Sequence, residues 1–468
     1  MDSLFDPENC KKDMFFYTLH FIKSPDIVDY TDSFLHCRNY SRRRKVGLQA
    51  KAIAQLREQY PHVGRRILGI DAASNEIGCR PEVFAVAYRY LREHRYTYIT
   101  PSGIRKLPQL YTTYHVGEDF LDLSDGLRAI EEAILFLGMR SGDRLGHALA
   151  LGIDVEEWYL SKNYTIAISK QDYLDNLMWV YHKLWEYDIS GFINLREQIV
   201  SEFTKYFSEI YLVNFSEAEQ ICIDNLAQKE GIRRNKLYFS GESTIHNYYE
   251  AWKLRGDSPE FYRHGYFDEK EYIRKRNNFR INHDFPIDYH IRHNPEIAAI
   301  YYLYHYNKGV RIEGAKTIEV RINKHYIRAL CQIQKELQNF IARQGIAIET
   351  NPSSNTLIGT FRDYAKHPIV KFFNKGLIHD GNQLKDNPQL QVSINTDDQG
   401  VFNTSLENEY ALIACALEML TDKDDKPLYN KYDIYNWIDK IRCMGNEQSF
   451  GYLSDMKEKG LYYDEPDK

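Results

Sequence analysis

The first third of the chain alternates between two hydrophobic patterns. Short, apolar, β-prone runs occur at residues 14–22, 66–73 and 110–116, and a fourth run ends at His147. Between them, apolar residues recur at three- and four-residue spacing over residues 45–60, 81–94 and 127–137. The runs predict strands, the first of them buried, and the spaced segments predict helices. This alternation favours parallel βα units and therefore an α/β fold.

The alternation stops between residues 154 and 345. Long amphipathic stretches predict helices at residues 171–187, 195–211, 218–229, 244–254, 296–306 and 324–343. A strand-like piece lies at residues 317–322. A stretch of this length far exceeds an ordinary βα loop, which has only a few residues. We therefore expect a mostly helical insertion.

The strand–helix pattern then resumes. Strands are predicted at residues 346–350 and 391–396, and helices at residues 407–420 and 431–442. These changes of pattern divide the chain into four parts. We expect a first α/β part at residues 1–153, the insertion at 154–345, a second α/β part at 346–420 and a C-terminal helical segment at 421–468.

Polar side chains stand where several predicted strands end. The sequence HVGE contains His115 and Glu118, RLGH ends in His147, and SINTDD ends in Asp397 and Asp398. Side chains at the C-terminal ends of parallel barrel strands converge on one mouth. Two imidazoles, a glutamate and paired aspartates there predict metal-assisted water chemistry. Each motif alone also fits a surface loop, a hydrogen-bonded core histidine or a solvated turn.

Composition and charge indicate the class of protein and its cellular compartment. The chain of 468 residues is 43% hydrophobic, which suits a large globular core, and its net charge of −6 gives no global basic field for nucleic acid. The seven cysteines are scattered, which favours a reducing cytosol with mostly buried thiols over a disulfide scaffold or a cysteine zinc site. The first residues lack the apolar core of a signal peptide, and no run approaches the length of a membrane span. We therefore expect a cytoplasmic protein.

Taken in order, the motifs resemble those of the adenosine and AMP deaminase family of metal-dependent amidohydrolases. HVGE at 115–118, RLGH at 144–147, NPSSN at 351–355 and SINTDD at 393–398 are similar to the family's motifs on strands 5 to 8. The resemblance covers residues 14–151 and 346–420. It implies an incomplete (β/α)8 barrel of TIM type, in which this chain supplies strands 3 to 8. The helical insertion would then lie between strands 6 and 7.

The resemblance implies a role for each matching residue. His115 and Asp397 would be ligands of a Zn²⁺ ion. His147 would orient the attacking water, and Glu118 would protonate the purine ring nitrogen N1. The family's reaction is hydrolysis at C6 of adenine, with release of ammonia and formation of an inosine-type product. Zinc lowers the pKa of the water that it binds to about 7.

Two further positions would contact the substrate. Asp398 matches the carboxylate that contacts the water and purine N7. Ser74 stands where the family has a glycine whose backbone N–H touches the purine, and that N–H survives the replacement. The proline that follows the paired aspartates in the family is replaced here by Gln399.

The main departure concerns the start of the barrel. The family's first strand carries His-x-His, which supplies two more zinc ligands, and no His-x-His occurs in this sequence. His20 is no evident replacement, and His290 and His293 have the wrong spacing. An open barrel would leave two raw sheet edges. We expect that an upstream polypeptide supplies strands 1 and 2, that the sequence is a truncated piece, or that the product is a decayed remnant.

The small nucleoside enzymes of the family have no such insertion. The layout is similar to that of large insert-bearing deaminases of bacterial antiviral defence, which form homo-oligomers. A basic stretch at residues 272–280 could contact phosphates of a nucleotide or an RNA, although a solvated basic face is favoured.

The sequence is consistent with three functions. The first is a zinc aminohydrolase acting on adenosine or an adenine nucleotide in an antiviral or purine-metabolic setting. The second is a catalytically incomplete pseudo-deaminase that serves as a scaffold subunit. The third is an RNA-editing deaminase. The His-x-Glu and Pro-Cys-x-x-Cys signature of the cytidine-deaminase type is absent, so the barrel site would have to do this chemistry. A base within a polymer is difficult to bring into a barrel mouth, so a free nucleoside or nucleotide is preferred.

Overall fold

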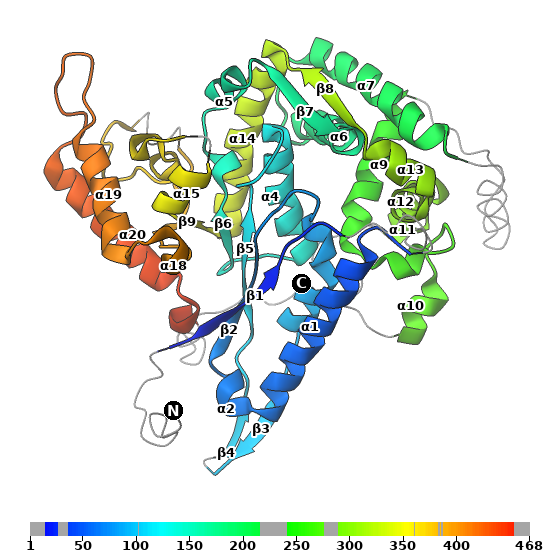
Figure 1. The fold of residues 1–468 in the computed structure, drawn as a ribbon, viewed down its shortest axis with the longest axis horizontal. Coiled ribbons are helices and arrows are strands. Elements are labelled where there is room, and N and C mark those ends of the chain that lie inside the picture. The colour runs from blue at the N-terminus through cyan, green and yellow to red at the C-terminus, as the bar shows by residue number, and fades with distance from the viewer. Residues whose placement is uncertain are drawn as a thin grey trace.

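The computed structural model describes residues 15–26, 36–101, 103–215, 241–275, 289–359, 361–381, 384 and 387–453. The helix predicted at residues 218–229 lies outside these ranges, as do residues 276–280 of the basic stretch. A central sheet runs through the molecule, with helices along it and a larger helical mass beside it (Figure 1).

The central sheet contains six strands in the order β1-β2-β5-β6-β9-β10. Their bounds are Tyr17–Ile22, Ile67–Ala73, Tyr111–Val116, Arg144–His147, Ala347–Thr350 and Val392–Ile394. Every pair of neighbours is parallel. The spatial order follows the order in the chain, because each connection returns the chain to the next position in the sheet. The predicted α/β class is therefore confirmed.

The edge strand β1 is more exposed than its sequence suggests. Phe21 is 1% exposed, but Tyr17 and Ile22 are 48% and 63% exposed. Among the described residues, β1 pairs only with β2 and β10 pairs only with β9. The prediction that this first strand is buried is wrong, because the strand ends the sheet and its apolar side chains are not all covered.

Three helices precede β6. They are α1 (Tyr40–Gln59), α3 (Ala85–Arg92) and α4 (Leu123–Leu137). Helix α1 begins at Tyr40 rather than at residue 45, because its first turn is too polar to show hydrophobic spacing. The helix predicted at residues 81–94 is divided into a 3₁₀ turn at Pro81–Val83 and α3.

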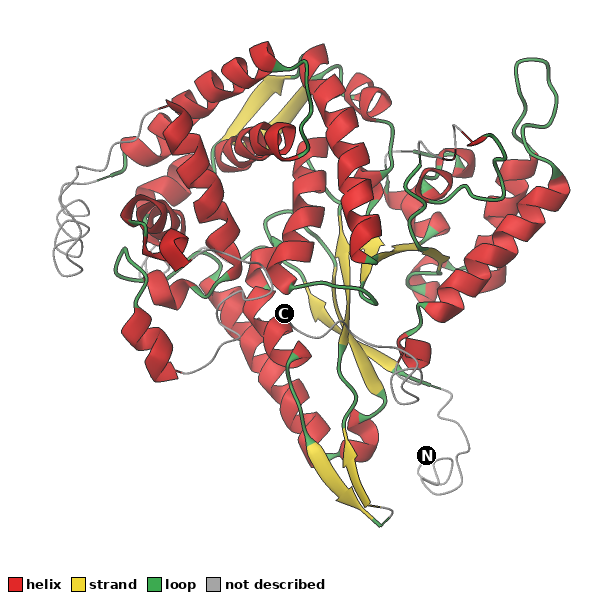
Figure 2. Ribbon diagram, turned by 180° about the vertical axis from the view of Figure 1, so that it is seen from behind, coloured by secondary structure: helices red, strands yellow, loops and turns green. Residues whose placement is uncertain are grey.

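The chain between β6 and β9, here called the β6–β9 segment, is mostly helical. Its main helices are α5 (Val155–Ser161), α6 (Lys170–Glu186), α7 (Ile193–Phe207), α9 (Gly241–Lys253), α12 (Pro295–Tyr306), α13 (Lys308–Gly314) and α14 (Lys324–Gln344). The predicted strand at 317–322 is observed as β8 (Thr317–Arg321), which pairs antiparallel with β7 (Thr165–Ser169). This pair lies at the far edge of the helical mass (Figure 2). Strand β7 escaped prediction because it runs directly into α6.

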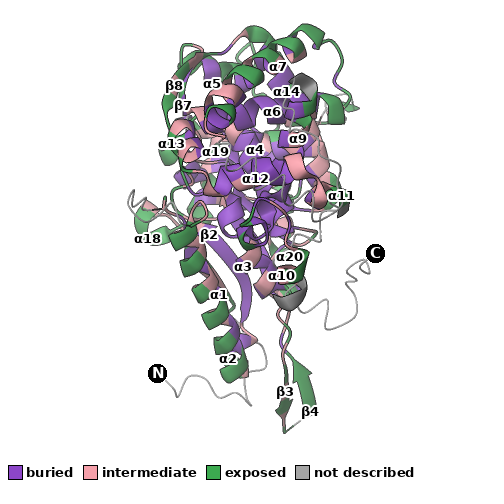
Figure 3. Cartoon of the chain, turned by 90° about the vertical axis from the view of Figure 1, so that its right-hand side faces the viewer, coloured by how far each residue is buried: buried purple, intermediate pink, exposed green. Residues whose placement is uncertain are grey.

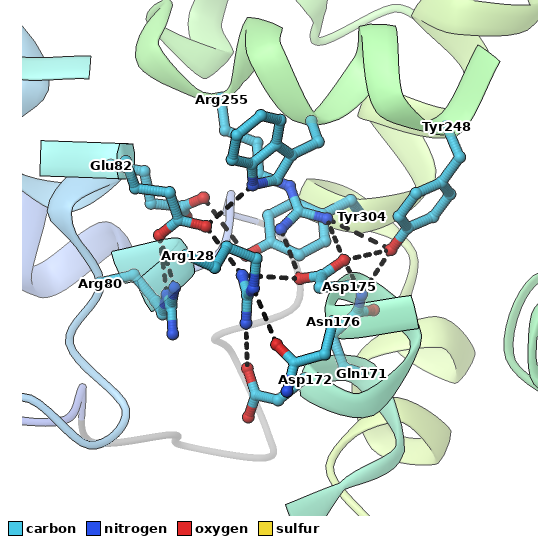
Figure 4. Close-up of polar contacts among 12 residues, drawn as sticks. Arg80, Glu82, Arg128, Gln171, Asp172, Asp175, Asn176, Tyr248, Arg255 and Tyr304 are labelled. Carbon is cyan, nitrogen blue, oxygen red and sulfur yellow. Dashed lines mark hydrogen bonds and ion pairs between the residues drawn. The ribbon is translucent and has the colours of Figure 1, made fainter. Parts of the chain in front are cut away.

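Buried charges join the β6–β9 segment to α4. Arg128 of α4 is fully buried and donates to Glu132 at 2.7 Å and to Asn176 of α6 at 3.0 Å. Arg255, which follows α9, donates to both carboxylate oxygens of Asp175 at 2.6 Å and 2.9 Å. The contacts of Arg128 cross the interface between α4 and the segment, and the pair of Arg255 and Asp175 lies beside them within the segment (Figure 4). Separating buried, paired charges is costly because each would be left uncompensated.

The C-terminal part consists of α19 (Leu406–Glu418) and α20 (Lys431–Glu447), and α20 packs on β10. An antiparallel hairpin of β3 (Thr97–Thr100) and β4 (Gly103–Lys106), which was not predicted, projects from the end of the molecule opposite β7 and β8 (Figure 3). Its two strands are too short and too polar to show strand periodicity in the sequence. Within the described ranges, no helix has the length and apolar character needed to cross a membrane.

The cysteines depart from expectation. Of those that the structure describes, Cys79 is buried and Cys37 is partly buried. Cys331, Cys415 and Cys443 are exposed. Among the described cysteines, the expectation of mostly buried thiols is therefore wrong.

Candidate metal centre

Three side chains from separate strands meet at one end of the sheet. His115 lies near the end of β5, His147 ends β6, and Asp397 follows β10. Their possible ligand atoms all lie within 4.8 Å of one another. The centroids of the two imidazole rings are 4.7 Å apart, and Asp397 Oδ2 lies 3.7 Å from His147 Nε2. The structure thus brings these three predicted residues together.

An uncommon backbone conformation recurs where these strands end. The angle φ is +63° at His147, +56° at Asp397 and +82° at Ser74. Residues other than glycine rarely adopt this left-handed region, because the Cβ atom is crowded there. Such strained positions persist only where the surroundings hold them, and they concentrate at functional sites.

The close approach of β6 to His115 depends on Gly146. A Cβ atom at this position would lie 3.1 Å from His115 Cα and 3.2 Å from the ring atoms Cγ and Nδ1. Any other residue would therefore press on the imidazole. The glycine of the RLGH motif thus has a steric reason to be there.

Asp71 of β2 holds the imidazole of His115. Its carboxylate oxygens lie 2.9 Å and 3.1 Å from His115 Nδ1, and it also pairs with His20 of β1 at 3.0 Å. Burial opposes protonation of His115, but the charge and the hydrogen bond of Asp71 outweigh it and raise the pKa of His115 to about 9. With Nδ1 bound to a carboxylate, Nε2 of His115 is the nitrogen left for a metal, as in most metal-binding histidines.

Asn355, in α15 (Pro352–Ile358), sets the tautomer of His147. Its Nδ2 lies 2.6 Å from His147 Nδ1. Its Oδ1 accepts the backbone N–H of Asn351 at 3.1 Å and lies 3.1 Å from His367 Nε2. If the side-chain amide of Asn355 were rotated by 180°, its NH₂ group would face the backbone N–H of Asn351, and two donors would oppose each other. His147 Nδ1 is therefore the acceptor, and Nε2 carries the proton.

A neutral His147 with its proton on Nε2 is a hydrogen-bond donor and not a metal ligand. Burial, together with the nearby charge of His115, lowers the pKa of His147 well below its usual value and keeps the ring neutral. Of the three residues that meet, His115 and Asp397 are then free to bind a metal. His147 is placed to donate to a water or a substrate beside it.

Glu118 lies next to His147 with one carboxylate oxygen unsatisfied. Its Oε1 is buried and 3.2 Å from His147 Nδ1, yet it has no hydrogen-bond partner among the described residues. Burial first, and then the charge of Glu76, raise the pKa of Glu118 to about 8. Glu76 also holds the loop, because its carboxylate accepts the backbone N–H groups of Gly117 at 2.9 Å and Glu118 at 3.0 Å. The unsatisfied oxygen is the kind of group that a ligand or a water would complete.

The two remaining predicted residues are exposed. Ser74 directly follows β2. Asp398 begins α18 (Gln399–Phe402), where its Oδ1 accepts the backbone N–H groups of Gly400 at 2.9 Å and Val401 at 3.1 Å. Asp398 therefore caps a helix here, which is a structural role beside the predicted contact with substrate.

Sequence reasoning missed the residues that hold the predicted ones. Asp71 had a usable signal, because it is the charged residue of an otherwise apolar strand, ILGIDAA. Asn355 was placed near the mouth only as part of a motif, without a role. Glu76 lies in a loop after β2 and its sequence context carries no signal.

The donor set fits a zinc-type ion in part. Zinc prefers imidazole nitrogen and carboxylate oxygen, and catalytic sites usually have three protein ligands. His115 and Asp397 provide one of each kind, and Asp71 supplies the supporting carboxylate behind His115. Two ligands are fewer than such a site requires. Within the described residues, the centre is therefore incomplete.

Parts of this chain are similar to known deaminases. The family model described as adenosine deaminase matches residues 318–427, which include Asn355 and Asp397 but neither histidine of the centre. An adenine deaminase of Sinorhizobium medicae (strain WSM419) is 29% identical over 93 residues, 20% of this chain and 24% of that protein. An adenosine deaminase of Plasmodium gallinaceum is 33% identical over 76 residues, 16% of this chain and 17% of that protein. The matched part is thus at most about a quarter of either relative.

Proposed function

Because the chain belongs to the adenosine/AMP deaminase family, we propose that it takes part in the zinc-dependent hydrolytic deamination of adenosine or an adenine nucleotide. Water and the adenine base would give the 6-oxo purine of the inosine form and ammonia. The observation that carries this proposal is the meeting of His115, His147 and Asp397 within 4.8 Å at the ends of three parallel strands.

Each residue of the centre has a distinct part in the proposed reaction. His115 and Asp397 hold Zn²⁺, which when bound acts as a Lewis acid and lowers the pKa of water. His147 donates from Nε2 and orients the water toward C6 of the purine. Glu118, with its raised pKa, gives a proton to purine N1, which makes C6 more electrophilic.

Two exposed residues complete the proposed substrate contacts. The carboxylate of Asp398 contacts the water and purine N7. The backbone N–H of Ser74 faces the purine at the end of β2, where the left-handed backbone turns the chain. Both roles come from the family resemblance, and their positions beside the strand ends support them.

We further propose that the six strands are strands 3 to 8 of a TIM-type barrel, with residues 1–153 and 346–420 as its two parts. Residues 154–345 would be the insertion, and residues 421–468 the C-terminal segment. The parallel order of the sheet and the one-sided pairing of β1 and β10 support this assignment. An upstream polypeptide with strands 1 and 2 would pair with both edges, and its His-x-His would complete the ligand set.

The test is an assay of ammonia and inosine formation with added zinc. The chain is purified alone and together with the polypeptide encoded directly upstream, and adenosine, AMP, ATP and single-stranded RNA are compared at one ionic strength. Turnover is expected in the complex, with free nucleoside or nucleotide preferred over RNA. Glu118→Gln should lower the rate by about 10²- to 10⁴-fold without changing the zinc content. A complex with neither zinc nor turnover would reject the proposal.

The incomplete ligand set also favours a second candidate, a scaffold subunit of an oligomeric assembly without catalysis. The biological setting would be antiviral defence or purine metabolism, in the cytoplasm. Glu118→Gln separates the two candidates, because it keeps the shape of the side chain. A biological effect that survives this change favours the scaffold, and one that is lost favours the enzyme.

A further inference from the structure

A cavity of about 240 Å³ lies between the sheet and the β6–β9 segment. Its wall combines residues that follow β1 and β2 with residues at the starts of α1 and α6 and with Tyr304 of α12. None of His115, His147 and Asp397 lines it. The cavity is therefore separate from the metal centre, although it is built on the same strand ends.

Lys23, which follows β1, is a buried cation in this wall. It is 1% exposed, and its ammonium donates to the backbone carbonyl of His115 and lies 4.2 Å from the centroid of the Tyr114 ring. Neither contact supplies a negative charge, and no carboxylate pairs with Lys23 in the described part of the chain. A buried ammonium without a counter-ion is unfavourable. An anion in the cavity would supply the missing partner.

Arg38 adds a second cation to the wall. Its Nε donates to the carbonyl of Tyr304 at 3.1 Å, but its Nη2 is buried and has no hydrogen-bond partner among the described residues. Next to it, α1 begins after Asn39 with no side-chain cap and no acidic residue in its first turn. The free N–H groups and the positive end of this helix favour an anion at the same place.

Two carboxylates of the wall are already neutralised. Asp125 pairs with Arg80 and, at 2.7 Å, with Arg128. Asp172, at the start of α6, pairs with Arg128 at 3.7 Å and accepts the hydroxyl of Ser169 at 2.6 Å. Arg80, Arg128 and Asp172 lie together beside the cavity (Figure 4). These acids therefore do not compensate Lys23.

Two acids remain on the wall. The carboxylate of Glu76 accepts backbone N–H groups of the loop after β5, including that of Glu118 at 3.0 Å. Asp119 is partly exposed, so its charge is better solvated than that of Lys23. The wall therefore carries three cations and four carboxylates, but no carboxylate of the described residues pairs with Lys23 or Arg38.

We propose that this cavity binds a phosphate-type anion through Lys23, Arg38 and the start of α1. The volume suits a phosphate or a diphosphate, whereas sites for whole drug-sized ligands span about 300–1,000 Å³. The anion would receive charge-assisted hydrogen bonds from both side chains. Because Lys23 also holds the carbonyl of His115, an occupied cavity would support the strand end that carries the metal centre.

The phosphate has two chemical sources. It is either the phosphate of a bound nucleotide substrate or a separate phosphorylated effector. Binding of the anion itself does not depend on the proposed deaminase activity.

The test is calorimetric titration of the chain with sodium pyrophosphate in the presence of EDTA. The wild type should bind at one site. Lys23→Gln and Arg38→Gln should each weaken the affinity at least tenfold, and Ala315→Trp should do the same by filling the cavity mouth, since Ala315 is exposed on its wall. Lys106→Gln, which removes the same charge from the exposed strand β4, serves as the control.

Absence of pyrophosphate binding, or equal weakening in all variants including Lys106→Gln, overturns the proposal. Because replacement of the buried Lys23 can unfold the chain, unchanged affinity in both Arg38→Gln and Ala315→Trp overturns it as well. Titration with AMP and adenosine then separates the two sources. Competition between AMP and pyrophosphate, with Arg38→Gln weakening AMP but not adenosine, indicates the substrate's own phosphate. Simultaneous binding of AMP and pyrophosphate indicates an effector.

Discussion

The side-chain amide of Asn355 donates to Nδ1 of His147 over 2.6 Å, and this contact decides which ring nitrogen carries the proton. It turns a residue that could have been a third metal ligand into a donor that faces Asp397. The chemistry of the centre therefore depends on Asn355, which is neither a proposed metal ligand nor a proposed substrate contact.

Asn355→Asp should reverse this arrangement. An aspartate keeps the shape but accepts hydrogen bonds, so the proton of His147 would move to Nδ1 and Nε2 would no longer donate. We expect a loss of rate of about 10²-fold or more, with KM changed much less. Nitrogen NMR of the imidazole reports the tautomer without any need for turnover.

Asn395→Asp is the matched control for this change. Asn395 follows β10, and its side chain donates to Ser393 Oγ at 2.9 Å instead of to His147. It should leave the tautomer of His147 as in the wild type. If Asn355→Asp also leaves the tautomer unchanged, the argument from the amide is wrong.

Asp71→Asn should weaken zinc binding by about 10- to 100-fold, as expected for the loss of a carboxylate behind a ligating histidine. Competition with a chromophoric chelator measures this affinity. His20→Gln is the control, because it removes the other partner of Asp71 and leaves the pair with His115 in place. Equal affinities in the wild type and Asp71→Asn would show that Asp71 does not support the metal.

Ser74→Gly should stabilise the chain by about 1 kcal/mol, because glycine adopts φ near +82° without a Cβ penalty. The backbone N–H is kept, so purine binding should not fall. The midpoint of urea unfolding measures the effect. Ser74→Ala keeps the Cβ atom and should show no such gain; a gain of equal size in both variants would rule out backbone strain as the cause.

His182 should make the chain less stable in mild acid. Its ring stacks on Tyr249 with centroids 3.9 Å apart, its Nε2 is buried without a hydrogen-bond partner among the described residues, and burial, followed by the charge of His246, lowers its pKa to about 3. A histidine with a lowered folded pKa contributes fully to stability above the unfolded pKa of about 6.5, and this contribution is lost as the pH falls below that value.

His182→Phe keeps the ring stack and removes the titration. Between pH 7.5 and pH 5.5 the wild type should lose about 1.4 kcal/mol more unfolding free energy than this variant. Urea unfolding at the two pH values measures the difference. His325→Phe, at an exposed position of α14, is the control. Parallel pH profiles for the wild type and His182→Phe would contradict the prediction.

The sequence was sufficient for the strands that carry chemistry, because each combines an apolar run with a polar residue at its end. His115, His147 and Asp397 could be placed at one mouth for that reason, and the structure brings them within 4.8 Å. The hairpin β3–β4 was missed because its strands are short and polar, and the strand β7 because it runs directly into α6. The exposure of β1 was also missed, because an apolar run has the same sequence pattern in an edge strand and in a central strand.

The supporting contacts could not be read from the sequence. Asp71 and His115 lie on different strands, and only the pairing of β2 with β5 brings them to 2.9 Å. The tautomer of His147 depends on the orientation of a single amide in α15. Both depend on three-dimensional packing, which the local pattern of residues does not predict.

Arg128 and Arg255 have a consequence for movement. Asp175 accepts from both guanidinium groups, at 3.5 Å from Arg128 and at 2.6 Å from Arg255. A hinge that swung the helical mass away from α4 would separate Arg128 from Asn176 and Asp175, whereas Arg255 and Asp175 would move together. Such a hinge is therefore costly on this flank, and access to the strand ends would depend on movement of the short loops there.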